Sequence, residues 1–373
     1  MDFNLSEEQR LLKESAELFV ERDYPFTKHR EISESPEGFD PAMWKNLAEM
    51  GWLGMPFAEE DGGFDGSAIE TMIVMEAMGK GLMVEPFLAT VVLGGGLIAE
   101  AGSAKQKKDI IPTIAAGDMR LTFAHTEPRA RFNLAHVETK AEKTGAGYRL
   151  NGHKSVVLDG AGADRIIISA RGEDGITLFV LDGANPGLVI RGYPTVDGGR
   201  AAEIELTDVE AGPGDILGPE GGAYPLIERA AQRAIAALCA EGVGLMGVLQ
   251  SDTLEYIKTR QQFGRSIGSF QALQHRMADM FIELEQARSM AYMATLRLDE
   301  PDEELRGQAI SAAKVQIGRG GRFVGQQAVQ LHGGMGMTDE LMVSHYFKRL
   351  TVIDTQFGNV DYHLDKMTEE PKG

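Results

Sequence analysis

The spacing of apolar residues changes twice along the chain, and this change limits the fold more than any other feature. Residues 1–118 and 223–373 follow the three-to-four-residue spacing of helices, whereas residues 119–222 alternate with period two in short runs. Short strands in close succession are typical of a sandwich or barrel, and long helices with short connections of a bundle. The sequence therefore predicts an α+β protein with an N-terminal α-helical domain (1–118), a central β-sandwich or barrel domain (119–222) and a C-terminal four-helix bundle (223–373).

Individual elements follow from the same spacing and from the turn residues between the apolar runs. Ser6 and Gln9 have the spacing of a capping box, which predicts the start of the first helix. The glycine clusters Gly94–Gly96 and Gly318–Gly321 lack the context of a nucleotide-binding loop, so helix packing is the simpler interpretation. Further helices are predicted at 41–50, 67–79, 104–115, 223–259, 268–298, 302–330 and 338–349, and strands at 121–127, 136–143, 148–158, 165–171, 176–182, 188–194 and 202–210.

The charge of the chain and its single cysteine exclude several classes of protein. The 373 residues carry 37 basic and 56 acidic side chains, a formal charge of −19, which opposes nucleic acid as a general partner. Cys239 alone forms no internal disulfide or thiolate cluster, and the eight histidines lack zinc-like spacing. No apolar run reaches about 18 residues, and the N-terminus lacks the pattern of a secretory signal. We expect a cytoplasmic protein without a membrane span or a metal site.

Two segments of the C-terminal part suit a dinucleotide. Thr259–Met280 contains Arg260, whose delocalised cation and fixed donor fork suit a pyrophosphate, and Phe263, whose ring can pack against an adenine or flavin. Gln330–Glu340 reads QLHGGMGMTDE, and its glycines allow backbone N–H groups to approach a diphosphate closely. The residues alone leave two alternatives open, a helix C-cap for the glycines and a solvated salt bridge for Arg260.

These two segments, together with FAHTEP at Phe123–Pro128 and the later GYRLNGHKSVVLDGAGAD, resemble the acyl-CoA dehydrogenase family over nearly the whole chain. The resemblance implies FAD-dependent α,β-dehydrogenation of an acyl-CoA thioester, with electrons passing to an electron-transfer flavoprotein. It also implies a homo- or hetero-oligomer, a dimer or tetramer, because the family's FAD site spans subunits. By the same resemblance, FAD would be bound by Thr126, Arg260, Phe263, Gln271, Gln330, Leu331, His332, Gly333 and Gly334.

The sequence departs from the family at the catalytic base. The two positions that usually hold a glutamate match Phe357 and Gln232, and neither side chain can take a proton. Glu241 lies within the apolar stripe of a predicted helix, where a carboxylate is costly unless it is paired or functional. We interpret Glu241 as the candidate base and Arg233 as a cation on the substrate or CoA side. The alternative for Glu241 is an ion pair with an arginine of a packed helix, and Asp354 is a weaker candidate base.

The β-domain departs from the family as well. The family's T-E-P-G-x-G-S-D becomes Thr126–Asn133, TEPRARFN, and its W-I-T becomes Val156–Leu158. Arg129 and Arg131 either contact phosphates of CoA or are plain surface charges.

This combination of departures at the base and in the β-domain resembles the small subunit of heteromeric, pimeloyl-CoA-type dehydrogenases. An alternative function is therefore a catalytically silent subunit that completes the FAD site of a homologous partner, and a flavin oxidase is a third. Dicarboxylic, branched, aromatic and steroid side-chain thioesters all stay open as substrates, and we expect a role in fatty-acid or steroid side-chain degradation.

Overall fold

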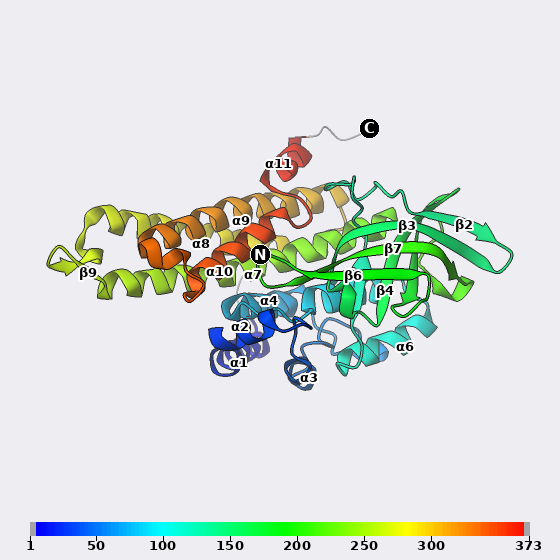
Figure 1. The fold of residues 1–373 in the computed structure, drawn as a ribbon, viewed down its shortest axis with the longest axis horizontal. Coiled ribbons are helices and arrows are strands. Elements are labelled where there is room, and N and C mark those ends of the chain that lie inside the picture. Colours follow the sequence, from blue (N-terminus) through cyan, green and yellow to red (C-terminus); the bar gives the residue numbers. More distant parts are fainter. Residues whose placement is uncertain (1–4, 369–373) are drawn as a thin grey trace. The chain divides into compact units, whose positions relative to one another are not determined.

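The computed structural model describes residues 5–368 and forms two compact units. The helical unit contains the described residues up to Glu31, Ala68–Met83 and the residues from Ile235 on, and the sheet unit contains Ile32–Ser67 and Val84–Ala234. Figure 1 shows the helices at both ends of the chain and the strands between them in sequence. The predicted architecture, with N-terminal helices, a central β-domain and C-terminal helices, is confirmed. The boundaries at residues 118 and 222 stay predictions.

Helices form the N-terminal part, and local signals explain where they begin. The Ser6 side chain accepts a hydrogen bond from the backbone N–H of Gln9, and the Gln9 side chain accepts one from the backbone N–H of Ser6, which confirms the capping box. Asp40 caps another helix in the same manner through the backbone N–H of Ala42. The helices are α1 (Glu7–Asp23), α2 (Phe26–Glu34), α3 (Pro41–Glu49), α4 (Ala68–Gly81), a π-helix (Leu88–Gly95), α5 (Gly96–Ala101) and α6 (Ala104–Ala115).

The strands of the sheet unit form one mixed sheet. Its order is β6-β7-β3-β2-β4-β5-β8, and β1 pairs with β4. The β1–β4 and β2–β4 pairs are parallel and the other neighbours antiparallel. Short hairpin connections explain the antiparallel pairs β2–β3, β4–β5 and β6–β7. The bounds are β1 (Leu121–Ala124), β2 (Lys140–Thr144), β3 (Gly147–Leu158), β4 (Arg165–Gly172), β5 (Gly175–Asp182), β6 (Leu188–Pro194), β7 (Arg200–Ala211) and β8 (Ile216–Leu217).

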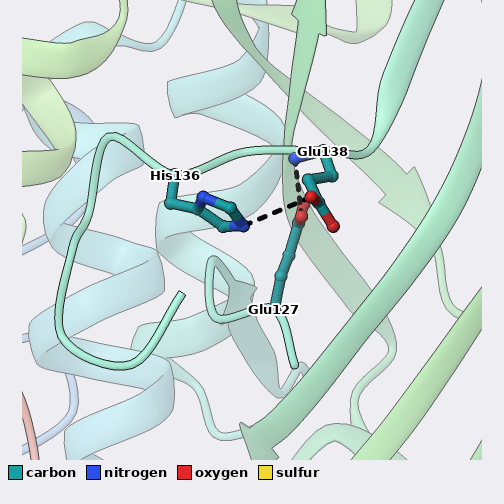
Figure 2. Close-up of side chains that lie close together, drawn as sticks. All are labelled: Glu127, His136 and Glu138. Carbon is teal, nitrogen blue, oxygen red and sulfur yellow. Dashed lines mark hydrogen bonds and ion pairs between the residues drawn. The ribbon is translucent and has the colours of Figure 1, made fainter. Parts of the chain in front are cut away.

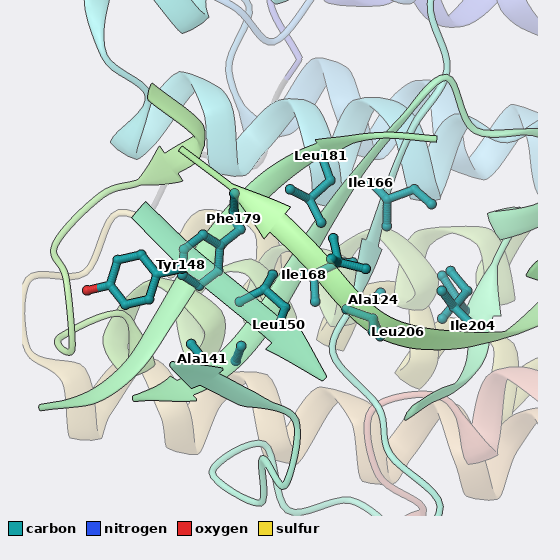
Figure 3. Packing of buried hydrophobic residues seen from close by; sticks show 14 of the residues in the cluster. Ala124, Ala141, Tyr148, Leu150, Ile166, Ile168, Phe179, Leu181, Ile204 and Leu206 are labelled. Carbon is teal, nitrogen blue, oxygen red and sulfur yellow. The ribbon is translucent and has the colours of Figure 1, made fainter. Parts of the chain in front are cut away.

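Alternate residues of neighbouring strands build the core of the sheet unit (Figure 3). Ile168 of β4 lies opposite Phe179 of β5 in the register, and both side chains are fully buried. Ile204 and Leu206 of β7 follow at the spacing of two that places side chains on one face. Burying each such side chain stabilises the fold by roughly 1.5–3 kcal/mol, so the register is strongly specified.

Long helices dominate the C-terminal part. The most apolar stretch of α7 has the length and composition of a membrane span, but 78% of this stretch is buried inside the protein, as in a core helix. Glycines allow α4 and α7 to touch: a Cβ atom on Gly79 would lie 2.2 Å from the carbonyl oxygen of Glu241, and one on Gly244 would lie 2.1 Å from that of Glu76. The elements are α7 (Tyr224–Thr259), β9 (Gln261–Gln262), β10 (Arg265–Ser266), α8 (Gln271–Leu296), α9 (Glu303–His332), α10 (Met342–Thr355) and α11 (Val360–Thr368).

Candidate functional site

A tight hairpin at the end of α7 presents Phe263 to solvent. Phe263 and Gly264 both have positive φ angles, +56° and +77°, between the short strands β9 and β10. This conformation suits glycine, but it is costly for a bulky side chain. Phe263 is 89% exposed, so burial of its side chain contributes little to the stability of the fold. An exposed aromatic ring on a strained turn suits contact with a ligand or another chain.

The glycine bend after α9 has open backbone. Gly333 has a φ of +61°, and a Cβ atom on Gly333 or Gly334 would have no neighbour within 4 Å. At Gly336, by contrast, the Cβ atom would lie 2.8 Å from the carbonyl oxygen of Val329. Packing therefore explains Gly336, whereas neither packing nor a positive φ explains Gly334. The bend leaves room for a group from outside the chain to approach the backbone, which fits a diphosphate.

The five predicted residues of this segment divide into two groups. Gln330, Gly333 and Gly334 line a surface hollow of about 590 Å³ that Arg276 of α8 also lines. Arg276 was absent from the sequence prediction, because no linear spacing relates α8 to the end of α9. The other two residues, Leu331 and His332, are 6% exposed each, and the His332 ring stacks on Tyr256 with 4.2 Å between centroids. They hold the end of the helix instead of facing the hollow.

Arg260 and Gln271 flank the hairpin, and both are exposed. The backbone N–H of Arg260, the residue after the end of α7, donates to the carbonyl of Tyr256 at 2.8 Å and so continues the helical hydrogen bonding by one residue. Among residues 5–368, no carboxylate lies within 4.0 Å of the Arg260 guanidinium, so the alternative of a salt bridge has no counterpart there. Gln271 is the first residue of α8. Both side chains are free to contact a ligand.

Thr126 lies in the sheet unit, in the turn that follows β1. Its carbonyl accepts a hydrogen bond from the backbone N–H of Ser155 at 2.9 Å. The neighbouring Glu127 is buried. One of its carboxylate oxygens accepts hydrogen bonds from the Lys154 ammonium and the Thr139 hydroxyl, both at 2.7 Å. Burial lowers the pKa of Lys154 to about 8, although the charge of Glu127 opposes this shift. Burial alone would raise the pKa of Glu127, but Lys154 and the hydrogen bonds lower it. This buried pair anchors the turn that carries Thr126.

Glu127, His136 and Glu138 lie close together (Figure 2). One possible ligand atom of each residue lies within 4.8 Å of the others, a spacing that a metal ion could use. Glu127 is already engaged, however, because one carboxylate oxygen accepts the backbone N–H of Glu138 at 2.6 Å and the other accepts Lys154. The Lys154 charge neutralises the carboxylate without a metal. The arrangement favours a structural role for this cluster.

Arg233 of α7 has unused donors. One of its terminal nitrogens, Nη1, lies 2.5 Å from a carboxylate oxygen of Glu100, and the other oxygen of Glu100 lies 2.9 Å from Arg229. The Nε and Nη2 atoms of Arg233 are buried, and no hydrogen-bond partner for them lies among the described residues. Gly96 approaches this edge, since a Cβ atom there would lie 3.2 Å from Nε. Buried donors without acceptors are costly, so the arrangement suits an acceptor from a substrate.

Glu241 is 5% exposed, and both of its carboxylate oxygens face Arg349 of α10. Its oxygens lie 2.5 Å from Nε and 2.7 Å from Nη2 of that arginine, a bidentate pair. This geometry agrees with the alternative of an ion pair with an arginine on a packed helix. The pair fixes the orientation of the carboxylate and leaves one lone pair on each oxygen for a further contact.

The loop after α10, which matches the family's usual base position, is held by a buried lysine. The Lys314 ammonium donates to the carbonyls of Ile353, Asp354 and Gly358 at 2.8, 2.9 and 2.7 Å. Phe357 in this loop has a φ of +58° and carries no ionisable group. The Asp354 carboxylate turns toward α9, where it pairs with Arg322 at 3.0 Å. The weaker candidate base is thus engaged with α9.

Known proteins match this chain over nearly its whole length, in sequence and in fold. The patterns of the acyl-CoA dehydrogenase N-terminal, middle and C-terminal domains match residues 6–118, 122–209 and 225–370. The probable acyl-CoA dehydrogenase YngJ of Bacillus subtilis is 30% identical over 359 residues, 93% of each chain. The ChsE4–ChsE5 complex of Mycobacterium tuberculosis superposes with a TM-score of 0.89 at 26% identity over 98% of each chain. The FAD complex of PigA superposes with a TM-score of 0.90 at 27% identity over 98% of each chain.

Proposed function

Because the chain belongs to the acyl-CoA dehydrogenase family, we propose that it is an FAD-dependent enzyme that oxidises the Cα–Cβ bond of an acyl-CoA thioester. The observation that carries this proposal is the open backbone at Gly333 and Gly334. No atom of the described residues lies within 4 Å of the place where a Cβ atom would be at either glycine. The exposed Phe263 of the same helical unit adds a flat apolar surface for a ring system. We further propose an electron-transfer flavoprotein as electron acceptor and the cytoplasm as location.

The chain offers donors and surfaces suited to FAD. FAD, when bound, accepts the hydride that leaves Cβ of the substrate. Arg260 would pair with the diphosphate through its donor fork, and Phe263 would pack against a ring. The family resemblance places the contacts of the helical and sheet units on FAD molecules of neighbouring subunits, so the two sets need not meet in one chain. The full set proposed to hold FAD is Thr126, Arg260, Phe263, Gln271, Gln330, Gly333 and Gly334, with Leu331 and His332 shaping the bend.

For the proton step we propose Glu241 as base and Arg233 as substrate-side cation. The α-proton would pass to a carboxylate oxygen of Glu241 while negative charge develops on the thioester oxygen. The unpaired N–H groups of Arg233 would then donate to an oxygen of the substrate. Each carboxylate oxygen of Glu241 already accepts one hydrogen bond from Arg349, so its second lone pair would take the α-proton.

A second function is favoured by that same ion pair. If Glu241 serves only as the structural partner of Arg349, the chain has no base at this position and instead completes the FAD site of a homologous catalytic partner. A relative of similar fold was solved as a complex of two named proteins, ChsE4 and ChsE5. Either function implies an oligomer, a dimer or tetramer of identical or different subunits.

Absorbance of the purified full chain separates the two functions. A chain that carries flavin and whose flavin band bleaches on addition of an acyl-CoA is an enzyme by itself. A chain that acquires flavin only together with a second homologous subunit is the silent partner. A chain that neither binds flavin alone nor acquires it with any homologue would contradict both.

Variants test the base within the active preparation. Glu241→Gln should retain flavin but lose bleaching by about 10²-fold or more, as expected when the group that takes the proton is lost. Asp354→Asn is the matched control, because Asp354 is also a buried carboxylate paired with an arginine. Normal bleaching in Glu241→Gln, or loss only in Asp354→Asn, would remove Glu241 from the mechanism.

A further inference from the structure

Two neighbouring arginines in the sheet unit have no hydrogen-bond or ion-pair partner among residues 5–368. Arg129 and Arg131 are exposed on the turn after Thr126, and no carboxylate, carbonyl or aromatic ring contacts their guanidinium groups in the described chain. Each of the other arginines of the sheet unit has such a contact, namely Arg120, Arg149, Arg165, Arg171, Arg191, Arg200, Arg229 and Arg233. In a chain of charge −19, two unpaired cations two residues apart are an exception.

The backbone of Arg131 is strained. Its φ is +49°, in the left-handed region that glycine adopts freely. Among residues 5–368, no hydrogen bond, ion pair or cation–π contact of the Arg131 side chain compensates for this conformation. Non-glycine residues in this region concentrate at ligand-binding and switch sites. The strain at Arg131 therefore indicates a use for its side chain outside the fold.

The turn that carries both arginines is pinned on either side. Before it, Glu127 is held by the buried Lys154 at 2.7 Å. After it, the Arg171 guanidinium donates to the carbonyls of Ala135 and Val137 at 2.7 and 3.0 Å. Figure 2 shows Glu138 beside Glu127, whose carboxylate accepts the backbone N–H of Glu138 at 2.6 Å. Cations on a fixed turn lose less conformational freedom on binding than cations on a mobile loop.

We propose that Arg129 and Arg131 form an anion-binding subsite for the acyl-CoA substrate. Guanidinium forks match the oxygens of a phosphate or a carboxylate in geometry and charge. Two parts of a substrate carry that chemistry, the phosphates of CoA and a carboxylate at the far end of a dicarboxylic acyl group. The subsite rests on the proposed function, and it narrows the acyl group to a dicarboxylic one if the bound anion is the carboxylate.

Binding to the full chain, with its partner subunit where flavin requires one, tests the subsite. Calorimetric titration would compare CoA with 3′-dephospho-CoA, and adipyl-CoA with hexanoyl-CoA, in wild type, Arg129→Gln and Arg131→Gly. A lost charged hydrogen bond should weaken binding roughly tenfold. If the variants lose the preference for CoA over dephospho-CoA, the anion is the phosphate; if they lose the preference for adipyl-CoA, it is the carboxylate. A uniform tenfold loss for all four ligands assigns the subsite to the diphosphate that they share.

Two controls keep this test decisive. Arg131→Gly removes the strain, so its melting temperature should equal or exceed that of wild type while binding weakens. Arg191→Gln changes the charge equally at an exposed, ion-paired arginine of the same unit and should bind as wild type. Variants at Arg129 and Arg131 that bind all four ligands like wild type would overturn the subsite alone. A wild type that binds none of the CoA compounds would overturn the proposed function instead.

Discussion

At the scale of single residues, the ion pair between Glu241 and Arg349 affects both the stability of the fold and the role of Glu241 as a base. Both side chains are largely buried, with 6% and 17% of their surfaces exposed, and they meet in a bidentate contact. Removing one member of a buried pair leaves the other charge without a partner, which usually costs more than the pair contributes. The contact therefore constrains any role that Glu241 has as a base.

We expect Arg349→Leu to lower the free energy of unfolding by about 3 kcal/mol, because Glu241 would stay buried and unpaired. Urea denaturation measures this change. Arg288→Leu is the matched control, since Arg288 pairs with Glu285 at 2.7 Å while 40% and 43% of these side chains are exposed, and such pairs contribute about 0–1 kcal/mol. Equal effects of the two substitutions would show that Glu241 is solvated and free to move.

The sequence located Glu241 as unusual, but it left the partner open. Its place in an apolar stripe is a local property, and that property suggested either a base or an ion pair. Arg349 lies 108 residues further along the chain, so no spacing rule connects the two. The same reason explains why Arg276 was missed beside Gln330 and why the unused donors of Arg233 became visible only in the structure.

At the scale of elements, the glycines of α7 divide into those that touch another helix and those that do not. A Cβ atom on Gly244 would lie 2.1 Å from the carbonyl oxygen of Glu76 in α4, a backbone atom that no rotamer change can move. A Cβ atom on Gly247, one helical turn further on, would have no neighbour within 4 Å. The same substitution, glycine to alanine, should therefore destabilise the protein at Gly244 and stabilise it at Gly247.

Gly244→Ala should destabilise the protein by about 2–3 kcal/mol, because α4 and α7 must move apart. Gly247→Ala should stabilise it by about 0.5–1 kcal/mol, since alanine restricts the unfolded chain and favours a helix. Thermal melts of the two variants beside wild type measure both effects. Shifts in the same direction would mean that the close contact between α4 and α7 does not persist in solution.

The bounds of most elements followed from apolar spacing alone. The helix at 104–115 and the strand at 188–194 agree with α6 and β6 at both ends. The segment Leu88–Ala101 was missed because it is apolar almost all round, so it shows no amphipathic period, and its glycines read as a break. In the structure those glycines serve packing, since a Cβ atom on Gly95 would lie 2.5 Å from the ring of Phe57.

At the scale of the whole molecule, the buried histidine His363 should make the free energy of unfolding depend on pH. It is 2% exposed and contacts the Ser311 hydroxyl and the Phe357 carbonyl at 3.1 Å each. Burial and the nearby charge of Lys314 lower the pKa of His363 to about 4, from 6.5 in an exposed histidine. Between these two pH values the unfolded chain binds a proton that the folded chain does not. Stability is therefore complete above pH 6.5 and decreases as the pH falls toward 4.

Wild type should lose about 2–3 kcal/mol from this histidine between pH 6.5 and 4. His363→Gln should show a shallower decrease over the same interval, whatever its absolute stability. His275→Gln, at an exposed histidine of α8, should leave the slope unchanged. Urea unfolding at several pH values gives the slopes. A slope that is identical in His363→Gln and wild type would show that this side chain is protonated in the fold.

The sequence by itself determined the succession of helical and β regions and the family, because both depend on residues close together in the chain. The segments proposed to contact FAD were chosen from the same local signals and stay a prediction. Apolar spacing, glycine positions and the R-x-x-F-G motif are all local. Only the tertiary structure decided that Arg349 holds Glu241 and that Gly336 is packed. It also decided that, within residues 5–368, Gly334 has open space beside it and Arg129 and Arg131 have no ion-pair partner. Pairing and free space arise between segments far apart in sequence, so no period or motif records them.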